Sequence, residues 1–352
     1  MTSETPEFRP ISRRTLFAAA LGGVAVGVVG NSLFAGAANA APAAGRKTLL
    51  IGSVDPLGNG ILQLTDPSLT GEQRIVAVNG QPNGIVGSPD GLRAYVGTVF
   101  GPGLSVVDVD GGRVTSEVQV GGFANQLVVS PDGKTVYVAT GSSGGGGSRG
   151  HVAVVDTATG EVRALIKAGL LPRTLALTPD GTQLFVGDER AKGITIIDTA
   201  KNAVSGSFKT EKSPMQLAID PKGKNLYVAS SRELITFDLR GGKTGSTELE
   251  GVPCGLAVHP NGTFAVVSLY AGRATDSQLV TVNINSNKVR TKEGNGKANG
   301  PLTMSKDGGR AFVLDKKNRK VTSADTSTGK PDGSLSTPNS NTPTCVAFVE
   351  TA

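Results

Sequence analysis

Four arginines stand in separate polar stretches of this 352-residue chain, and together they could bind an anion. A guanidinium group presents a rigid fork of donors that matches the oxygens of a phosphate or carboxylate. If the fold brings these arginines together, we expect a site for a small anionic ligand. Acidic neighbours allow the opposite outcome, in which ion pairs between loops neutralise the site. The arginines are Arg173, Arg190, Arg232 and Arg273, and the acidic neighbours are Asp188, Glu189, Glu233 and Asp276.

Other side chains that carry chemistry are few. The chain has two histidines, two cysteines and no tryptophan, and a closed zinc site would need nearly all of the histidines and cysteines. The acidic turn at 108–117 lacks the order of oxygens of a calcium loop. We therefore predict no metal site and no cofactor. His151 is a candidate base without a partner at a recognisable spacing, and Cys254 and Cys345 are expected as free thiols, with a disulfide as the alternative.

A short phrase recurs along the chain and indicates the elements that position these residues. "SPDGKTVYVA" begins at Ser130, and related phrases begin at 39- to 48-residue intervals at Ser88, Thr178, Asp220, His259 and Ser305. In such a phrase proline favours the first bend of a turn, aspartate caps it and glycine takes the positive φ. Because the phrase changes little between copies, we interpret it as a structural hairpin corner and not as a site.

Each repeat contains four short strands, and the ends of the chain complement each other. An apolar strand precedes the corner, a second follows it, a third ends in aspartate, and a more polar fourth closes the unit, which is typical of a propeller blade. Residues 47–54 look like a second strand, and residues 343–350 look like a first strand. We predict an all-β, seven-bladed β-propeller of four-stranded blades, closed by the C-terminal strand completing the N-terminal blade.

The same stretches carry a family resemblance. "SPDGKTVYVAT" at 130–140 and "VAVVDTATGEV" at 152–162 resemble the YVTN-type β-propeller repeat of YncE-like exported bacterial proteins, over about residues 45–350. The resemblance implies the fold. For function it implies a range that includes binding proteins, cell-surface layer proteins and lactonases of the 6-phosphogluconolactonase type, because one fold hosts many functions.

The N-terminus has the features of an export signal. "SRRTLF" at 12–17 precedes an apolar run, and "ANA" at 38–40 offers a small-residue cleavage site, which together resemble a twin-arginine signal. A retained transmembrane anchor is the alternative, although the apolar core is short and glycine-rich. We therefore expect a signal peptide at 1–40 and a single propeller domain at 41–352, exported to the cell wall, periplasm or exterior as a monomer with no transmembrane segment.

The corners of an up-and-down blade all lie on one face of the ring, and the loops between second and third strands lie on the other. These loops vary from blade to blade, as in the Gly-rich stretch at 141–150 and "DKKNRK" at 315–320. The inner strands begin at the same face, and we predict that their first residues surround the mouth of a central channel. The predicted ligand-binding residues are Asn83, Asn125, Arg173, Arg190, Gln216, Arg232 and Arg273.

Charge and composition leave three classes of function. The net charge of +6 is too small to indicate nucleic-acid binding. We expect a non-enzymatic exported protein that binds a small anionic ligand or a cell-envelope partner through this face. The alternatives are a lactonase-like hydrolase using Arg173, Arg232 and His151, and a structural module of the cell envelope.

Overall fold

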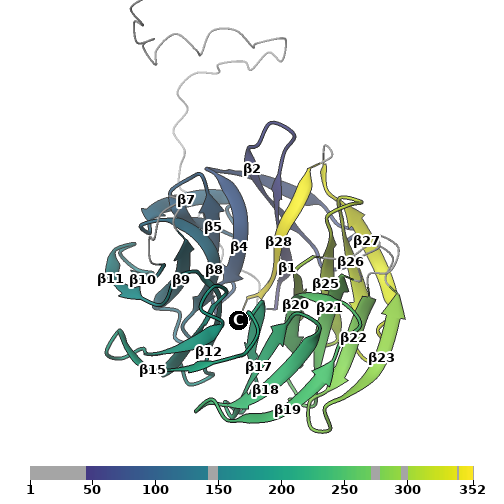
Figure 1. Cartoon of the computed structure of the whole chain (residues 1–352). Coiled ribbons are helices and arrows are strands. Elements are labelled where there is room, and N and C mark those ends of the chain that lie inside the picture. Colours follow the sequence, from purple (N-terminus) through teal and green to yellow (C-terminus); the bar gives the residue numbers. More distant parts are fainter. Residues whose placement is uncertain (1–44, 142–149, 271–277, 295–299, 339–340, 352) are drawn as a thin grey trace, which may run out of the picture. The chain divides into compact units, whose positions relative to one another are not determined.

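The computed structural model describes residues 45–141, 150–270, 278–294, 300–338 and 341–351. These residues form seven antiparallel sheets of four strands each, and they contain no helix. Figure 1 shows the sheets as blades arranged around a common centre. The predicted all-β, seven-bladed propeller is confirmed.

The strands of the first four blades run from the inner to the outer strand as follows. Blade 1 is formed by β28 (Thr342–Glu350), β1 (Lys47–Val54), β2 (Gly60–Thr65) and β3 (Gln73–Val78). Blade 2 is formed by β4 (Gln81–Gly87), β5 (Arg93–Val99), β6 (Gly103–Asp108) and β7 (Arg113–Gln119). Blade 3 is formed by β8 (Phe123–Val129), β9 (Thr135–Gly141), β10 (His151–Asp156) and β11 (Val162–Lys167). Blade 4 is formed by β12 (Pro172–Leu177), β13 (Gln183–Asp188), β14 (Gly193–Asp198) and β15 (Ala203–Lys209).

The remaining three blades repeat this order. Blade 5 is formed by β16 (Gln216–Ile219), β17 (Asn225–Ser230), β18 (Glu233–Asp238) and β19 (Lys243–Glu248). Blade 6 is formed by β20 (Val252–Val258), β21 (Phe264–Tyr270), β22 (Gln278–Asn283) and β23 (Lys288–Gly294). Blade 7 is formed by β24 (Leu302–Met304), β25 (Arg310–Asp315), β26 (Lys320–Asp325) and β27 (Pro331–Ser336).

The C-terminal strand closes the ring, as the sequence predicts. β28 pairs with β1 from Lys47 opposite Glu350 to Val54 opposite Thr342, with one register shift near Gly52. Figure 1 shows β28 in yellow between β1 and β4. Blade 1 is therefore assembled from both ends of the propeller.

The core is divided into seven apolar clusters, one between each pair of neighbouring blades. Leu50 of blade 1 packs in one cluster with Val96 of blade 2, and Phe312 of blade 7 packs in another with Val346 of blade 1. The middle strands are buried on both faces, as in β13, whereas the outermost β15 is mostly exposed. The middle strands are continuously apolar because neighbouring blades cover both of their faces. The outermost strands alternate between apolar and polar residues because one face is open to solvent.

The recurring corner phrase forms hydrogen-bonded turns. In blade 3 the Ser130 hydroxyl donates to Asp132 at 2.6 Å, and the Gly133 amide donates to the Ser130 carbonyl at 2.8 Å. Gly133 has a φ of +71°, as the turn requires. In blade 6 His259 stands in the serine position, and its Nδ1 accepts from the Asn261 amide at 3.1 Å. The side chains of the serine and aspartate, and of the histidine that replaces the serine in blade 6, thus bond within their own turn.

The two ends of the propeller, at Arg46 and Thr351, form a corner that lacks its tip. In the intact corner of blade 3, the Ser130 amide donates to the Thr135 carbonyl at 2.8 Å and the Thr135 amide donates to the Ser130 hydroxyl at 2.9 Å. Thr351 and Arg46 make the same two bonds in blade 1, at 3.0 and 2.9 Å. The ends therefore occupy the site of a seventh corner.

Substituting a corner glycine should destabilise the ring. A methyl group at Gly181, where φ is +72°, would lie 2.9 Å from Cδ of Pro131 in the preceding corner. We expect Gly181→Ala to cost about 1–2 kcal/mol and lower the melting temperature by a few degrees. Gly206→Ala is the control, since its new methyl would lie 3.7 Å from Ile196 and its φ is not positive. Equal thermal melts for the two variants would contradict the proposed role of the corner.

Candidate functional site

The inner strands of all seven blades line one cavity of about 620 Å³ along the centre of the ring. This confirms the prediction that the first residues of the inner strands surround a central channel. Asn299, which stands at the equivalent place in the sequence of blade 7, lies outside the described residues. The first residues of the inner strands that line the cavity are Asn83, Asn125, Gln126, Arg173, Met215, Gln216, Cys254 and Thr344.

A β-bulge directs one residue of each of five inner strands toward this cavity. The register of β4, β8, β12, β20 and β28 shifts by one residue directly after the strand begins. A bulge leaves one residue unpaired and turns its side chain away from the regular direction. The extra residues are Asn83, Asn125, Arg173, Cys254 and Thr344, and all five line the cavity. The repeat therefore places a variable side chain at the same point of the channel in blade after blade.

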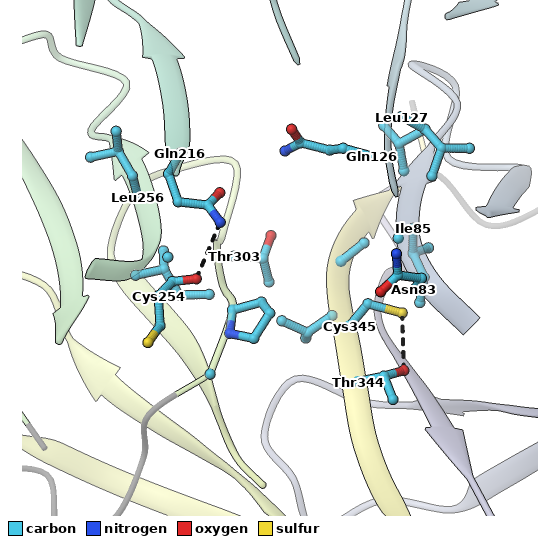
Figure 2. A pocket seen from close by; sticks show the side chains of 18 of the residues that line it. Asn83, Ile85, Gln126, Leu127, Gln216, Cys254, Leu256, Thr303, Thr344 and Cys345 are labelled. Atoms are coloured by element: carbon cyan, nitrogen blue, oxygen red, sulfur yellow. Dashed lines mark hydrogen bonds between the residues drawn. The ribbon is translucent and has the colours of Figure 1, made fainter. Parts of the chain in front are cut away.

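The amide side chains of the channel also connect the blades. Nδ2 of Asn83 donates to the Ala124 carbonyl at 2.9 Å, and Nδ2 of Asn125 donates to the Pro172 carbonyl at 2.8 Å. Nε2 of Gln216 donates to the Cys254 carbonyl at 3.4 Å, as Figure 2 shows. Because each donor is used by the next blade, the amide oxygens of these three residues are left to accept bonds.

One of the four predicted arginines lines the cavity. Arg173 does so, and its guanidinium lies 2.6 Å from Oε2 of Glu189. Arg190 and Arg232 are not among the residues that line it. Arg190 is exposed on the turn after β13, one strand farther from the centre than β12. Nη2 of Arg232 is bound to the Glu250 carbonyl at 2.7 Å, and Arg273 lies outside the described residues.

The acidic neighbours act differently from one another. Asp188 is buried and accepts from the Leu171 and Ala191 amides at 3.2 and 2.7 Å, so it caps the turn after β13. Glu233 pairs with Lys212 at 2.8 Å and does not pair with an arginine. Only the Arg173–Glu189 pair, within the part of the chain that the structure describes, follows the expected neutralisation across loops. Asp276 falls outside that part.

Lys316 is a second cation at the channel, and the sequence reasoning missed it. It lies on the turn between β25 and β26 and lines the cavity. No described carboxylate pairs with it, because the neighbouring Asp315 is buried and binds Asn318 at 2.8 and 2.6 Å. The sequence feature that could have indicated a cation here is "DKKNRK" at 315–320. It has four cationic residues and a single acidic residue, Asp315, which ends a strand.

The two cysteines are free thiols whose burial disfavours the thiolate. Cys254 is half-buried with Sγ 3.6 Å from the Val252 carbonyl, and Cys345 is buried with Sγ 3.6 Å from Oγ1 of Thr344. Figure 2 shows the two sulfur atoms pointing away from each other. Burial raises the pKa of the Cys254 thiol and raises the pKa of the Cys345 thiol to about 12. Both thiols are therefore poor nucleophiles at neutral pH.

Metal ligands and histidines do not gather at the channel. Among the described residues, no group of three or more His, Cys, Asp or Glu side chains could hold a metal ion. His151 is half-buried at the start of β10 and is not among the residues that line the cavity. His259 packs on Phe264 in a corner at the opposite face, with ring centroids 4.4 Å apart.

Comparison with known proteins identifies the fold. No family model matches the chain, and no curated protein matches its sequence. Hydrazine synthase of Kuenenia stuttgartiensis superposes with a TM-score of 0.64 and 20% identity, over 77% of this chain and 96% of that one. A candidate 6-phosphogluconolactonase of Bacteroides uniformis superposes with a TM-score of 0.67 and 16% identity, over 86% and 99%. At these identities the likeness shows the fold alone.

In the part of the chain that the structure describes, no helix has the length and apolar character needed to cross a bilayer.

Proposed function

We propose that this protein is a non-enzymatic binding protein that holds a small anionic ligand at the mouth of its central channel. The observation that carries the proposal is the cavity of about 620 Å³, lined by all seven blades and containing Lys316 and Arg173. A concave, preformed site with a few convergent polar groups is the usual form of a small-molecule site.

The lining suggests how such a ligand would be held. Lys316 offers a compact positive charge for an anionic group, and Arg173 contributes a guanidinium that it shares with Glu189. The amide oxygens of Asn83, Asn125 and Gln216 can accept bonds from hydroxyl groups, since their NH₂ groups are held by the next blade. A ligand with one anionic end and several hydroxyls fits this distribution.

The cellular setting forms part of the same proposal. Residues 1–40 act as a twin-arginine signal peptide, and the propeller works as an exported monomer of the YVTN-repeat type. The sequence motifs at 12–17 and 38–40 support export, and the regular corners support the repeat type. A cell-envelope partner remains the second candidate for the bound component, with a structural envelope role as its extension.

A hydrolase is the rival function, and one observation favours it. An arginine and a carboxylate, Arg173 and Glu189, lie 2.6 Å apart at a channel mouth, in a fold shared with a candidate 6-phosphogluconolactonase. Such a pair could hold and polarise an ester. A hydrolase must convert its substrate to product, whereas a binding protein only has to hold its ligand.

A thermal-shift screen separates these functions. We expect sugar phosphates or polyhydroxy acids to raise the melting temperature of the purified chain, by an amount that grows with concentration. Lys316→Gln and Arg173→Gln should each weaken the effect, whereas Lys222→Gln, an exposed lysine in a corner, should not. No shift with any anion would contradict the proposal. Hydrolysis of sugar lactones that Arg173→Gln abolishes would replace it with the hydrolase.

A further inference from the structure

Exposed apolar side chains are distributed unevenly over the propeller. Four of the large ones lie on the outermost strands, at Ile75, Leu165, Val204 and Val289. Four others lie on the face that carries the variable loops, at Leu57, Phe100, Leu170 and Tyr270. The described corner turns carry none of them. The two most exposed, Leu57 at 88% and Phe100 at 80%, lie on turns of the neighbouring blades 1 and 2.

These two turns are built on a close-packed base. Nε2 of Gln81 donates to the Gly58 carbonyl at 3.5 Å, which joins the turn of Leu57 to the connection between blades 1 and 2. The same connection packs on the turn of Phe100, since a methyl group at Gly80 would lie 2.8 Å from Cα of Gly101. The base holds both turns in place, while the two apolar side chains extend into solvent.

The backbone of Phe100 is unfavourable for an aromatic residue. Its φ is +59°, in the left-handed region that glycine adopts without cost and bulky side chains seldom adopt. An 80% exposed side chain gains little packing that could offset this strain. Lys192, Ser231 and Arg319 adopt a similar positive φ on the equivalent turns of blades 4, 5 and 7, so the conformation belongs to this kind of turn. What distinguishes Phe100 is a large aromatic side chain at such a position, left exposed to solvent.

Blade 7, on the other side of blade 1, carries three cations on the turn between β25 and β26 and a fourth at the first residue of β26. They are Lys316, Lys317, Arg319 and Lys320, and none has an ion-pair partner among the described side chains. The turn is rigid, because the Arg319 carbonyl accepts from both the amide and the hydroxyl of Thr337 at 2.8 and 2.9 Å. The turns of blades 1 and 2 hold one charge, Asp55, which is bound to Asn59 and to the Leu57 amide.

We propose that the loop face of blades 7, 1 and 2 docks on an anionic lipid bilayer. Phe100 and Leu57 enter the boundary between headgroups and acyl chains, and the cations of blade 7 that do not line the channel, Lys317, Arg319 and Lys320, bind lipid phosphates. Exposed apolar tips beside unneutralised cations are the combination that interfacial membrane binding requires. This surface is independent of the channel ligand, since Phe100, Leu57, Lys317 and Arg319 do not line the cavity.

Tryptophan fluorescence tests the proposal directly, because the chain has no tryptophan of its own. We expect the emission of Phe100→Trp and of Leu57→Trp, in the full chain, to move to shorter wavelength on vesicles of phosphatidylcholine with phosphatidylglycerol. Lipids brominated near the headgroup should quench it. Leu165→Trp, on an outer strand with 51% exposure, is the matched control and should show neither effect. No shift at either tip, or an equal shift at Leu165→Trp, would overturn the proposal, even if the chain binds vesicles through its N-terminus.

A second set of variants tests whether the cations of blade 7 contribute to membrane binding. In the Phe100→Trp protein, Lys317→Gln with Arg319→Gln should weaken vesicle binding about 25-fold, since each cation near an anionic bilayer contributes about fivefold. Lys222→Gln with Lys224→Gln removes the same charge from a corner and should leave binding unchanged. If both double variants lost vesicle binding equally, the effect would come from net charge alone and the assigned surface would be wrong. Vesicles of phosphatidylcholine alone should bind the parent and the turn variant equally weakly.

Discussion

A chain that ends at Asn341, and so lacks β28, is expected to have no cooperative thermal transition. β28 is the inner strand of blade 1 and contributes to the apolar clusters on both sides of that blade, with Ala347 and Val349 in one and Val346 in the other. Burial of these side chains is worth about 5 kcal/mol, which is comparable to the whole stability of many domains. The truncation would also leave β1 as an open sheet edge that favours aggregation.

A pair of point variants in β28 provides the control for this experiment. Ala347→Glu places a charge at a buried position of the strand and should approach the effect of the truncation, whereas Thr342→Glu changes an exposed position of the same strand. Calorimetry or circular dichroism melting measures all three proteins. If the truncated chain melts like the parent, blade 1 does not depend on its C-terminal strand and the closure of the ring is not what stabilises it.

The second large effect is expected from a circular permutant in which β28 comes first in the chain and is joined directly to β1. Thr351 and Arg46 already make the two bonds of a corner, at 3.0 and 2.9 Å, and four residues separate the equivalent positions in blade 3. A circular permutant running from 342 to 351, through Pro-Asp-Gly-Lys, and then from 46 to 341 should therefore fold. We expect it to melt at or above the temperature of the parent. Pairing of β28 with β1 then closes a loop of four residues and no longer a span of almost the whole propeller, which lowers the entropic cost of that pairing.

The linker in the permutant should matter in a defined way. Replacing Pro-Asp-Gly-Lys by four glycines keeps the connection but removes the fixed φ of proline and the aspartate cap, so its melting temperature should be lower. A permutant that fails to fold with either linker would show that the bonds of Thr351 and Arg46 do not represent a corner. A measurement of soluble yield and thermal melting is sufficient for both proteins.

The fold could be predicted from the sequence because its information is local and repeated. Six copies of a turn phrase such as Ser130–Gly133 fix the period, and the unmatched strands at 47–54 and 343–350 then have only each other as partners. The mouth of the channel followed from the same alignment, since each inner strand begins at a constant offset from its corner. The β-bulges that turn Asn83 and Asn125 into the channel were not visible, because they depend on pairing with the next strand.

The site was predicted less completely, because the direction of a long side chain depends on partners from other blades. Arg190 and Arg232 are on the expected face, but one lies at the tip of a turn and the other binds the Glu250 carbonyl. The sequence did not distinguish Lys316 from the other cations of the 315–320 loop, any of which could have pointed into solvent. Its importance follows only from Asp315 being buried and bound to Asn318, which leaves the cations of that turn without a local carboxylate.

The pairing of Lys47 with Glu350 also sets the order in which the protein can fold. While the chain is being synthesised, β1 to β27 can assemble as an open arc, but the first blade lacks its inner strand until residues 342–350 are made. The closing contact spans almost the whole propeller, and contacts of such long range form slowly. A chain that stalls before β28 is made therefore exposes an unpaired edge at β1. Pairing of the nine-residue β28 with β1 is the step that separates an open arc, which cellular proteases can attack, from a closed ring.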